Sequence, residues 1–141
     1  MARAILDLPK VFPFTTEINV RIGDINAANH VANDAIIQIL AEGRVRFLRR
    51  YGYRDLDIEG AGLIMADVVV IYKSEAFYGD VLVVEVGVGD FTRHGCDFLY
   101  RVSHKETGRE IVRAKNGFVF FDYEKRKPVD VPERFKALFF T

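Results

Sequence analysis

The stretch RIGDINAANHVAND, residues 21–34, marks the point at which the hydrophobic pattern of the chain changes. It holds two aspartates, three asparagines and one histidine between apolar flanks. Before it, Ile18, Val20 and Ile22 alternate with polar residues, which is the period-two pattern of a strand with one buried face. After it, apolar residues recur at helical spacing. We therefore expect the stretch to join a strand, residues 17–22, to a helix.

The helix is predicted to begin at Asn33 and to run for about five turns. Gly52 is well placed as its C-terminal cap. Its apolar positions spread over more than one narrow stripe, so we expect at least its first half to be surrounded by protein. Its arginines fall in the second half, where cations suit the negative end of the helix dipole.

Four strand-like runs follow the helix, at residues 63–73, 81–91, 96–104 and 110–123. The breaks between them carry Gly and Asp, as tight connections between antiparallel neighbours do. A strand, a long helix and four consecutive strands indicate an α+β domain. The simplest way to bury the helix is to wrap the sheet around it, and a short final helix is expected after Pro132. At 141 residues, the chain is expected to form a single domain.

Composition argues against several classes of partner. The 20 basic and 20 acidic residues cancel, so no net field indicates a nucleic-acid or anionic-membrane partner. The apolar runs are too short to span a membrane, and we expect a soluble, cytoplasmic protein. The single cysteine, Cys96, cannot form an internal disulfide and is expected to be a buried hydrophobe. Asp67 is notable as an acid inside an apolar run.

Metal and cofactor signals are weak. Three histidines far apart in the sequence and one cysteine do not form a ligand cluster, so we expect no metal site. Motifs of the P-loop, dinucleotide-binding and serine-elbow types are absent from the sequence, and no cofactor is expected.

The polar turn reads D-x-[DN]-x-x-x-H-V-x-N, and a glutamate, Glu42, stands nine residues past its last asparagine. With the later segments at residues 70–86 and 113–132, this order resembles the hotdog-fold acyl-CoA thioesterases related to 4-hydroxybenzoyl-CoA thioesterase. The resemblance covers residues 15–138. It implies a hotdog fold, which is a curved antiparallel sheet around one long central helix. It also implies at least a dimer and hydrolysis of acyl thioesters, carried by CoA or by an acyl carrier, at the subunit interface. The edge strand of a curved sheet tends to pair across a two-fold axis, so we expect a homodimer or homotetramer.

The sequence departs from that family at one important position. Many members carry a second aspartate in the turn, and the resemblance implies that it acts as base or nucleophile. Here that position is Asn26. A neutral amide does not take a proton from water at pH 7, but it orients water or donates to an oxyanion.

Thioester hydrolysis needs an activated water and donors at the carbonyl oxygen, where negative charge develops. The first amides of a helix lack intrahelical partners and lie at the positive end of its dipole. The amides near Val31, Asn33 and Asp34 are therefore substrate-binding candidates. The alternative is that the side chains of Asn33 and Asp34 simply cap the helix.

With Asn26, three further side chains are candidates for the chemistry, and each of these three has a structural alternative. Asp24 is a candidate general base if Asn26 positions the water. Its structural alternative is to accept hydrogen bonds from backbone amides within the turn. His30 suits proton transfer because histidine has an ordinary pKa of about 6.5, or it is a packed, hydrogen-bonded residue. Glu42 is a catalytic or water-binding candidate, or it forms an i,i+4 ion pair with Arg46.

Two other functions fit the same turn. The (R)-specific enoyl-CoA hydratases carry a D-x-N-P-x-H turn, to which Asp24, Asn26 and His30 are similar in order, although this chain lacks the proline and has one extra residue before the histidine. The third possible function is that of a protein that binds acyl-CoA without hydrolysing it, because Asn26 stands where the family has its catalytic aspartate.

Overall fold

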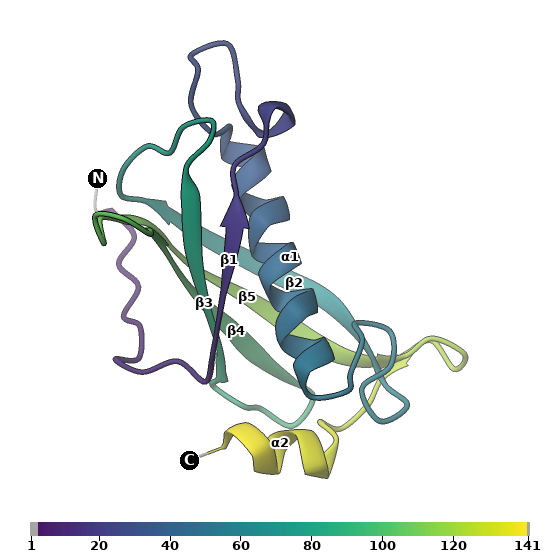
Figure 1. The fold of residues 1–141 in the computed structure, drawn as a ribbon. Coiled ribbons are helices and arrows are strands. Elements are labelled where there is room, and N and C mark those ends of the chain that lie inside the picture. Colours follow the sequence, from purple (N-terminus) through teal and green to yellow (C-terminus); the bar gives the residue numbers. More distant parts are fainter. Residues whose placement is uncertain (1–2, 141) are drawn as a thin grey trace.

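The computed structural model describes residues 3–140, and its main feature is a curved antiparallel sheet (Figure 1). Its strands are β1 (Phe14–Asn19), β2 (Gly62–Tyr72), β3 (Val81–Gly89), β4 (Gly95–His104), β5 (Glu110–Asp122) and β6 (Lys127–Pro128). Their order across the sheet is β1-β3-β4-β5-β2, with β6 paired to the end of β5. The four strands expected after the helix are confirmed, and their bounds shift by only one or two residues.

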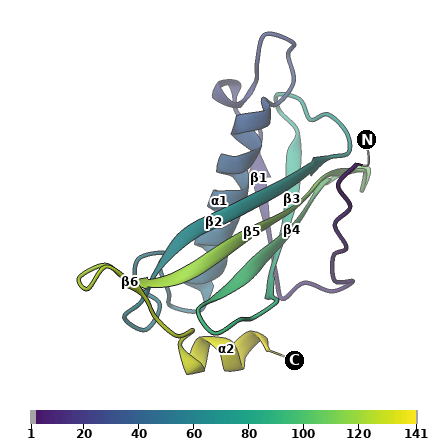
Figure 2. The ribbon, with the colours of Figure 1, turned by 180° about the vertical axis from the view of Figure 1, so that it is seen from behind.

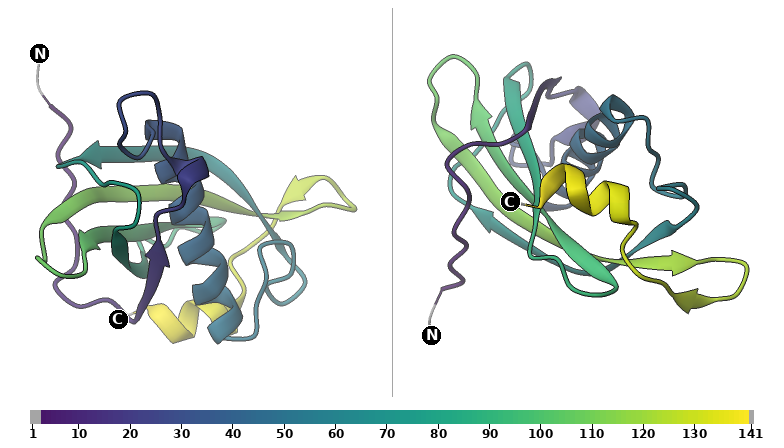
Figure 3. Two further views of the ribbon diagram at one scale, coloured as in Figure 1. Left: turned by 45° about the horizontal axis from the view of Figure 1, so that its top comes forward. Right: turned by 90° about the horizontal axis from the view of Figure 1, so that it is seen from below.

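The long helix α1 (Asn33–Arg50) lies in the hollow of this sheet (Figure 3). Ile36, Leu40 and Phe47 are among its buried side chains. The rings of Phe47 and Phe98, a residue of β4, lie 6.1 Å apart in an edge-to-face arrangement. Inward-facing residues of the strands alternate with outward-facing ones, as the pleat of a strand requires. The predicted α+β architecture, a sheet wrapped around one long helix, is confirmed.

Glycines matter at two points of α1. A Cβ atom on Gly43 would lie 2.8 Å from Cγ1 of Val84 in β3, which is closer than side chains pack. Glycine therefore lets the middle of the helix rest directly on the sheet. Gly52 follows the end of the helix with φ at +82°, so the prediction of a C-terminal glycine cap is confirmed.

The expectation that the first half of α1 is surrounded by protein is wrong for the single chain. Asn33, Asp34 and Gln38 are exposed, and Ile37 keeps 37% of its surface accessible. The reason is geometric, because the curved sheet covers one side of the helix and leaves a stripe of the other side open. None of the helices within residues 3–140 is long and apolar enough to cross a membrane.

The first strand lies earlier in the sequence than predicted. Ile18 and Val20 are buried as expected, but β1 ends at Asn19, and Ile22 is 67% exposed. The last ladder pair joins Asn19 to Val81, where β3 begins, so the chain beyond it has no strand to pair with. It turns instead into a short 3-10 helix, Ile22–Asp24.

A short helix, α2 (Glu133–Phe139), begins directly after Pro132, as predicted. It lies across the lower end of the sheet and below the end of α1, as the views from front and back agree (Figures 1 and 2). Phe135 is completely buried, and its ring contacts those of Phe120 and Phe139 at centroid distances of 5.5 and 5.1 Å. Aromatic packing therefore closes this end of the core.

The sequence analysis made expectations about two individual residues, Cys96 and Asp67. Cys96 is buried, as expected, and burial together with the nearby charge of Asp97 raises the pKa of its thiol to about 12. Asp67 is exposed, because β2 is an edge strand. One of its carboxylate oxygens accepts the Gly117 N–H at 3.0 Å beside a bulge in the β2–β5 pairing.

Candidate active site

The polar turn is held together mainly by Asp24. Its carboxylate accepts the Arg21 N–H at 2.8 Å, and its carbonyl accepts the Ala32 N–H at 2.9 Å. Only 9% of its surface is exposed. The structural alternative predicted for Asp24, a carboxylate that bonds an amide within the turn, is therefore present in the geometry.

Asn26 lies exposed in the turn, next to its tip. Its Oδ1 accepts the Ala28 N–H at 3.0 Å, and its own N–H donates to the His30 carbonyl at 2.9 Å. Asn29, between them, has φ at +66°, a backbone conformation that asparagine tolerates better than most residues. The asparagines of this stretch therefore shape the turn that presents His30.

His30 has a defined orientation. Its Nδ1 lies 3.0 Å from the Val31 carbonyl oxygen. A carbonyl oxygen only accepts, so the proton of the neutral ring must be on Nδ1. The lone pair of Nε2 is then free to take a proton, which is the state that a general base requires.

The start of α1 is not capped by a side chain. Its N-cap residue is Ala32, so the alternative in which Asn33 or Asp34 caps the helix is wrong. The Val31 N–H is also committed, because it donates to the Ala76 carbonyl at 2.8 Å. The amides of Asn33 and Asp34 follow the N-cap, where an α-helix offers no acceptor of its own. They are the donors that this helix start presents at the positive end of its dipole.

The predicted site residues that line a cleft lie in two separate clefts, one on each side of α1. The helix-start cleft, of about 270 Å³, lies between residues 30–36 and residues 72–76 and is lined by His30, Val31 and Asn33. The β1-side cleft, of about 460 Å³, lies between β1 and the opposite side of α1 and is lined by Asp24 and Glu42.

Glu42 forms the ion pair that its spacing allows. Its carboxylate accepts a hydrogen bond from Arg46 Nε at 2.8 Å, and Arg46 also donates to the Glu17 carbonyl of β1 at 2.8 Å. Asn26 and Asp34 belong to the lining of neither cleft. The tertiary structure therefore brings His30 and Asn33 together but places Glu42 on another side of the helix.

Tyr72 and Ser74, at the end of β2, are cleft residues that sequence reasoning missed. The Tyr72 hydroxyl donates to the Asn33 carbonyl at 2.9 Å. Burial, followed by the charge of Asp34, raises the pKa of the Tyr72 phenol. The only signal in the sequence was that both lie in the segment at residues 70–86, which carried the family resemblance without pointing to individual side chains.

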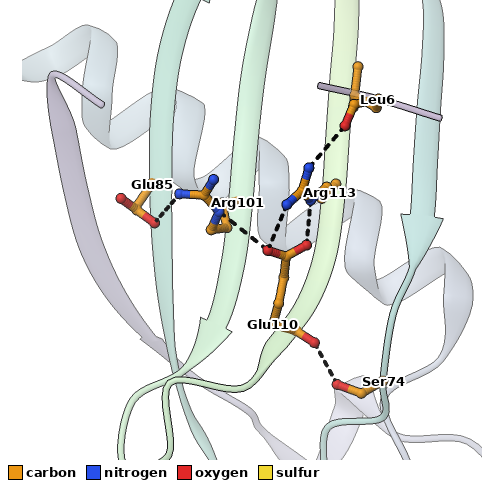
Figure 4. Close-up of polar contacts among 6 residues, drawn as sticks. All are labelled: Leu6, Ser74, Glu85, Arg101, Glu110 and Arg113. Carbon is orange, nitrogen blue, oxygen red and sulfur yellow. Dashed lines mark hydrogen bonds and ion pairs between the residues drawn. The ribbon is translucent and has the colours of Figure 1, made fainter. Parts of the chain in front are cut away.

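Charged groups on the outer face of the sheet support this wall of the cleft (Figure 4). The Ser74 hydroxyl donates to the Glu110 carbonyl at 2.7 Å. The Glu110 carboxylate accepts two hydrogen bonds from Arg113 and lies 3.4 Å from Nε of Arg101. Arg113 also donates to the carbonyl of Leu6, which belongs to the N-terminal segment crossing this face.

The hydrogen bond from Arg113, with the charges of Arg113 and Arg101, holds the pKa of Glu110 below its ordinary value of 4.5. A lowered pKa in the folded state means that the charged carboxylate stabilises the fold above pH 4.5, and that this contribution is lost as the pH falls below it. We expect Glu110→Gln to lower the free energy of unfolding by about 1 kcal/mol at pH 7, since the network is partly exposed.

Urea denaturation of wild type and Glu110→Gln at pH 7 and at pH 3.5 measures this difference. The gap between the two proteins should shrink at the lower pH. A gap of the same size at both values would mean that the loss comes from packing rather than from charge.

Within the residues that the structure describes, no three His, Cys, Asp or Glu side chains are placed to hold a metal ion. The helix-start cleft is lined by an imidazole, two hydroxyl-bearing residues, the charged residues Lys73 and Glu75, and the start of a helix.

Comparison with known proteins identifies the family and the fold of the chain. The family model described as the thioesterase-like superfamily matches residues 20–139. No curated protein sequence matches the chain.

Solved structures match over most of their length. A 1,4-dihydroxy-2-naphthoyl-CoA thioesterase from Synechocystis, Slr0204, is 21% identical with a TM-score of 0.80, covering 88% of this chain and 93% of its own. The PA2801 protein from Pseudomonas aeruginosa is 22% identical with a TM-score of 0.81, covering 91% and 98%. A DHNA-CoA thioesterase from Staphylococcus aureus is 19% identical with a TM-score of 0.77, covering 88% and 84%. These likenesses establish the hotdog fold, and the family match over residues 20–139 shows that the chain belongs to the thioesterase-like superfamily.

Proposed function

We propose that the chain hydrolyses acyl thioesters, with acyl-CoA as the substrate class, in the helix-start cleft. The observation that carries this proposal is that His30 and the uncapped start of α1 line the same cleft. The imidazole supplies a base, and the helix amides supply donors for an oxyanion, which are the two requirements of the reaction. Membership of the thioesterase-like superfamily supports the same chemistry.

In the proposed reaction, Nε2 of His30 takes a proton from water while the water oxygen attacks the carbonyl carbon of the thioester. Negative charge collects on the carbonyl oxygen and is stabilised by the Asn33 N–H at the start of α1. When the C–S bond breaks, the leaving thiolate takes the proton from the imidazolium. The products are a free acid and a free thiol, and the neutral imidazole is restored.

The other predicted residues take supporting roles in this proposal. Asp24 shapes the turn, because its carboxylate is committed to the Arg21 amide. The Asn26 side chain is proposed to shape the turn that presents His30, because its Oδ1 accepts the Ala28 N–H. Glu42 is proposed to bind water in the β1-side cleft, away from His30.

The free edge of the sheet supports a dimer. β2 pairs with β5 on one side, and its exposed face carries Met65, Val68 and Tyr72. An apolar edge strand with unpaired backbone groups favours pairing with another strand, and two copies related by a two-fold axis satisfy both edges at once. Light scattering should give a mass of twice 16.1 kDa or a multiple of that dimer. A monomer at micromolar concentration would contradict this assembly.

The proposed activity is tested by release of free thiol from short, medium, long and aryl acyl-CoA thioesters. We expect wild type to release thiol from at least one of them, and Asp24→Asn to lose less activity than variants of His30. Hydration of an enoyl-CoA with every thioester left intact would instead indicate a hydratase. Saturable binding of acyl-CoA without either reaction would indicate a binding protein.

A further inference from the structure

Three polar side chains that line the helix-start cleft, those of Tyr72, Ser74 and His30, share one property, which is that each already donates a proton to a backbone carbonyl. The Tyr72 hydroxyl donates to the Asn33 carbonyl at 2.9 Å, and the Ser74 hydroxyl donates to the Glu110 carbonyl at 2.7 Å. Nδ1 of His30 faces the Val31 carbonyl at 3.0 Å. Because carbonyl oxygens only accept, the proton in each pair must come from the side chain.

This commitment decides what the cleft is able to recognise. A hydroxyl has one proton and two lone pairs, so Tyr72 and Ser74 have only acceptor capacity left. The open start of α1 has the opposite character, because the backbone amide of Asn33 only donates. The cleft therefore has a donor at the start of α1, and Tyr72 and Ser74 add two acceptors to the opposite wall, which Lys73 and Glu75 also line.

Ser74 is held firmly in this state. The Lys73 and Ser74 amides donate to the Ile111 carbonyl at 2.8 and 3.3 Å. Arg109 donates from its side chain to the Glu75 carbonyl at 2.9 Å. Figure 4 shows that the acceptor of the Ser74 hydroxyl belongs to Glu110, whose side chain is clamped by arginines. The serine hydroxyl is thus fixed on both sides.

A thioester group itself contains no hydrogen-bond donor, so the partner of this wall must be carried by an atom close to it. A cleft of about 270 Å³ has the volume of roughly nine water molecules. The thioester and its immediate neighbours fill that volume, and the rest of the substrate extends beyond the cleft. The nearest donor is then the amide N–H two carbons from sulfur in the cysteamine end of CoA and acyl-carrier thiols, or a hydroxyl on the acyl group.

Building on the proposed hydrolysis, we propose that Ser74, aided by Tyr72, determines specificity by accepting a hydrogen bond from the amide N–H of the thiol arm. The thiol arm is favoured over the acyl group because every CoA or carrier thioester contains that amide, whatever its acyl chain. The contact is made equally in the ground state and the transition state, so it contributes to KM rather than to kcat.

The test compares one acyl group esterified to three thiols, which are CoA, N-acetylcysteamine and butanethiol. Only the first two carry the amide. We expect Ser74→Ala to raise KM about tenfold for both amide-bearing thioesters, to leave kcat unchanged, and to leave KM for the butanethiol ester unchanged. Ser74→Thr keeps a hydroxyl and should restore KM. Ser103→Ala removes the only other serine of the chain, on the outer face of β4, and serves as the matched control.

An equal loss on all three thioesters would show a merely structural role for Ser74 and would overturn the proposal. So would a loss that appears only when the acyl group bears a hydroxyl, because the donor would then lie on the acyl side. If wild type hydrolyses none of these esters, the proposed function fails on its own. Binding of the S-butyl thioethers of CoA and N-acetylcysteamine to wild type and Ser74→Ala then tests the recognition directly, and equal affinities would overturn it.

Discussion

Replacing His30 with alanine is expected to lower the rate of thiol release by about 10²- to 10⁴-fold, the usual contribution of a positioned general base. The expectation follows from the geometry of the ring, whose Nδ1 faces the Val31 carbonyl and whose Nε2 is left with a free lone pair. Without the imidazole, the helix start still stabilises an oxyanion, so a slow residual rate should remain. Steady-state kinetics on the best acyl-CoA of the panel provide the measurement.

His30→Gln separates proton transfer from packing. Glutamine is able to donate to the same carbonyl and to fill much of the same space, but its amide does not take a proton from water. Both variants should therefore be similarly inactive. His94→Ala, in the connection between β3 and β4, is the matched control and should keep near wild-type activity. High activity in His30→Gln would show that His30 positions the turn and that another group is the base.

Phe135→Ala is expected to lower the free energy of unfolding by about 3–5 kcal/mol, the range for removing a buried phenylalanine. The ring is completely buried, and it meets the rings of Tyr53, Phe91, Phe120 and Phe139 at centroid distances of 5.8, 6.3, 5.5 and 5.1 Å. No single neighbour is able to fill the cavity, since the surrounding rings belong to different elements. A loss of this size is a large part of the stability of an ordinary domain.

Urea denaturation of the full chain measures the loss. Leu138→Ala lies on the same helix but is 51% exposed, so it should change stability by no more than about 0.5 kcal/mol. A small loss for Phe135→Ala would mean that α2 is not part of the cooperative core. It would also mean that the aromatic packing at this end of the sheet contributes little to folding.

The sequence predicted many of the residues of the candidate site, but it did not predict their hydrogen-bond partners. The polar turn and the helix start were predicted, and both lie where the pattern placed them. The hydrogen bonds of Tyr72 and Ser74 were not predictable, because they join residues far apart in the chain. Tyr72 bonds a carbonyl 39 positions away, and Ser74 bonds one 36 positions away. No local pattern distinguishes such a hydroxyl from an ordinary surface hydroxyl.

The separation of Glu42 from His30 has a similar origin. Spacing along α1 predicted the pair with Arg46, because i,i+4 neighbours meet on any helix. Which side of the helix faces β1 and which faces β2 depends on how the helix rests on the sheet. That orientation follows from packing, such as the contact of Gly43 with Val84, and not from helical periodicity.

By itself, the sequence determined the order and type of the main strands and helices, because strand and helix periodicities are local properties of the chain. It also determined that a polar turn opens the long helix. Only the tertiary structure decided the strand order, with β2 at the edge, and the division of the candidate residues between two clefts. It alone decided that the hydroxyls of the helix-start cleft are acceptors, because carbonyls of distant segments take their protons.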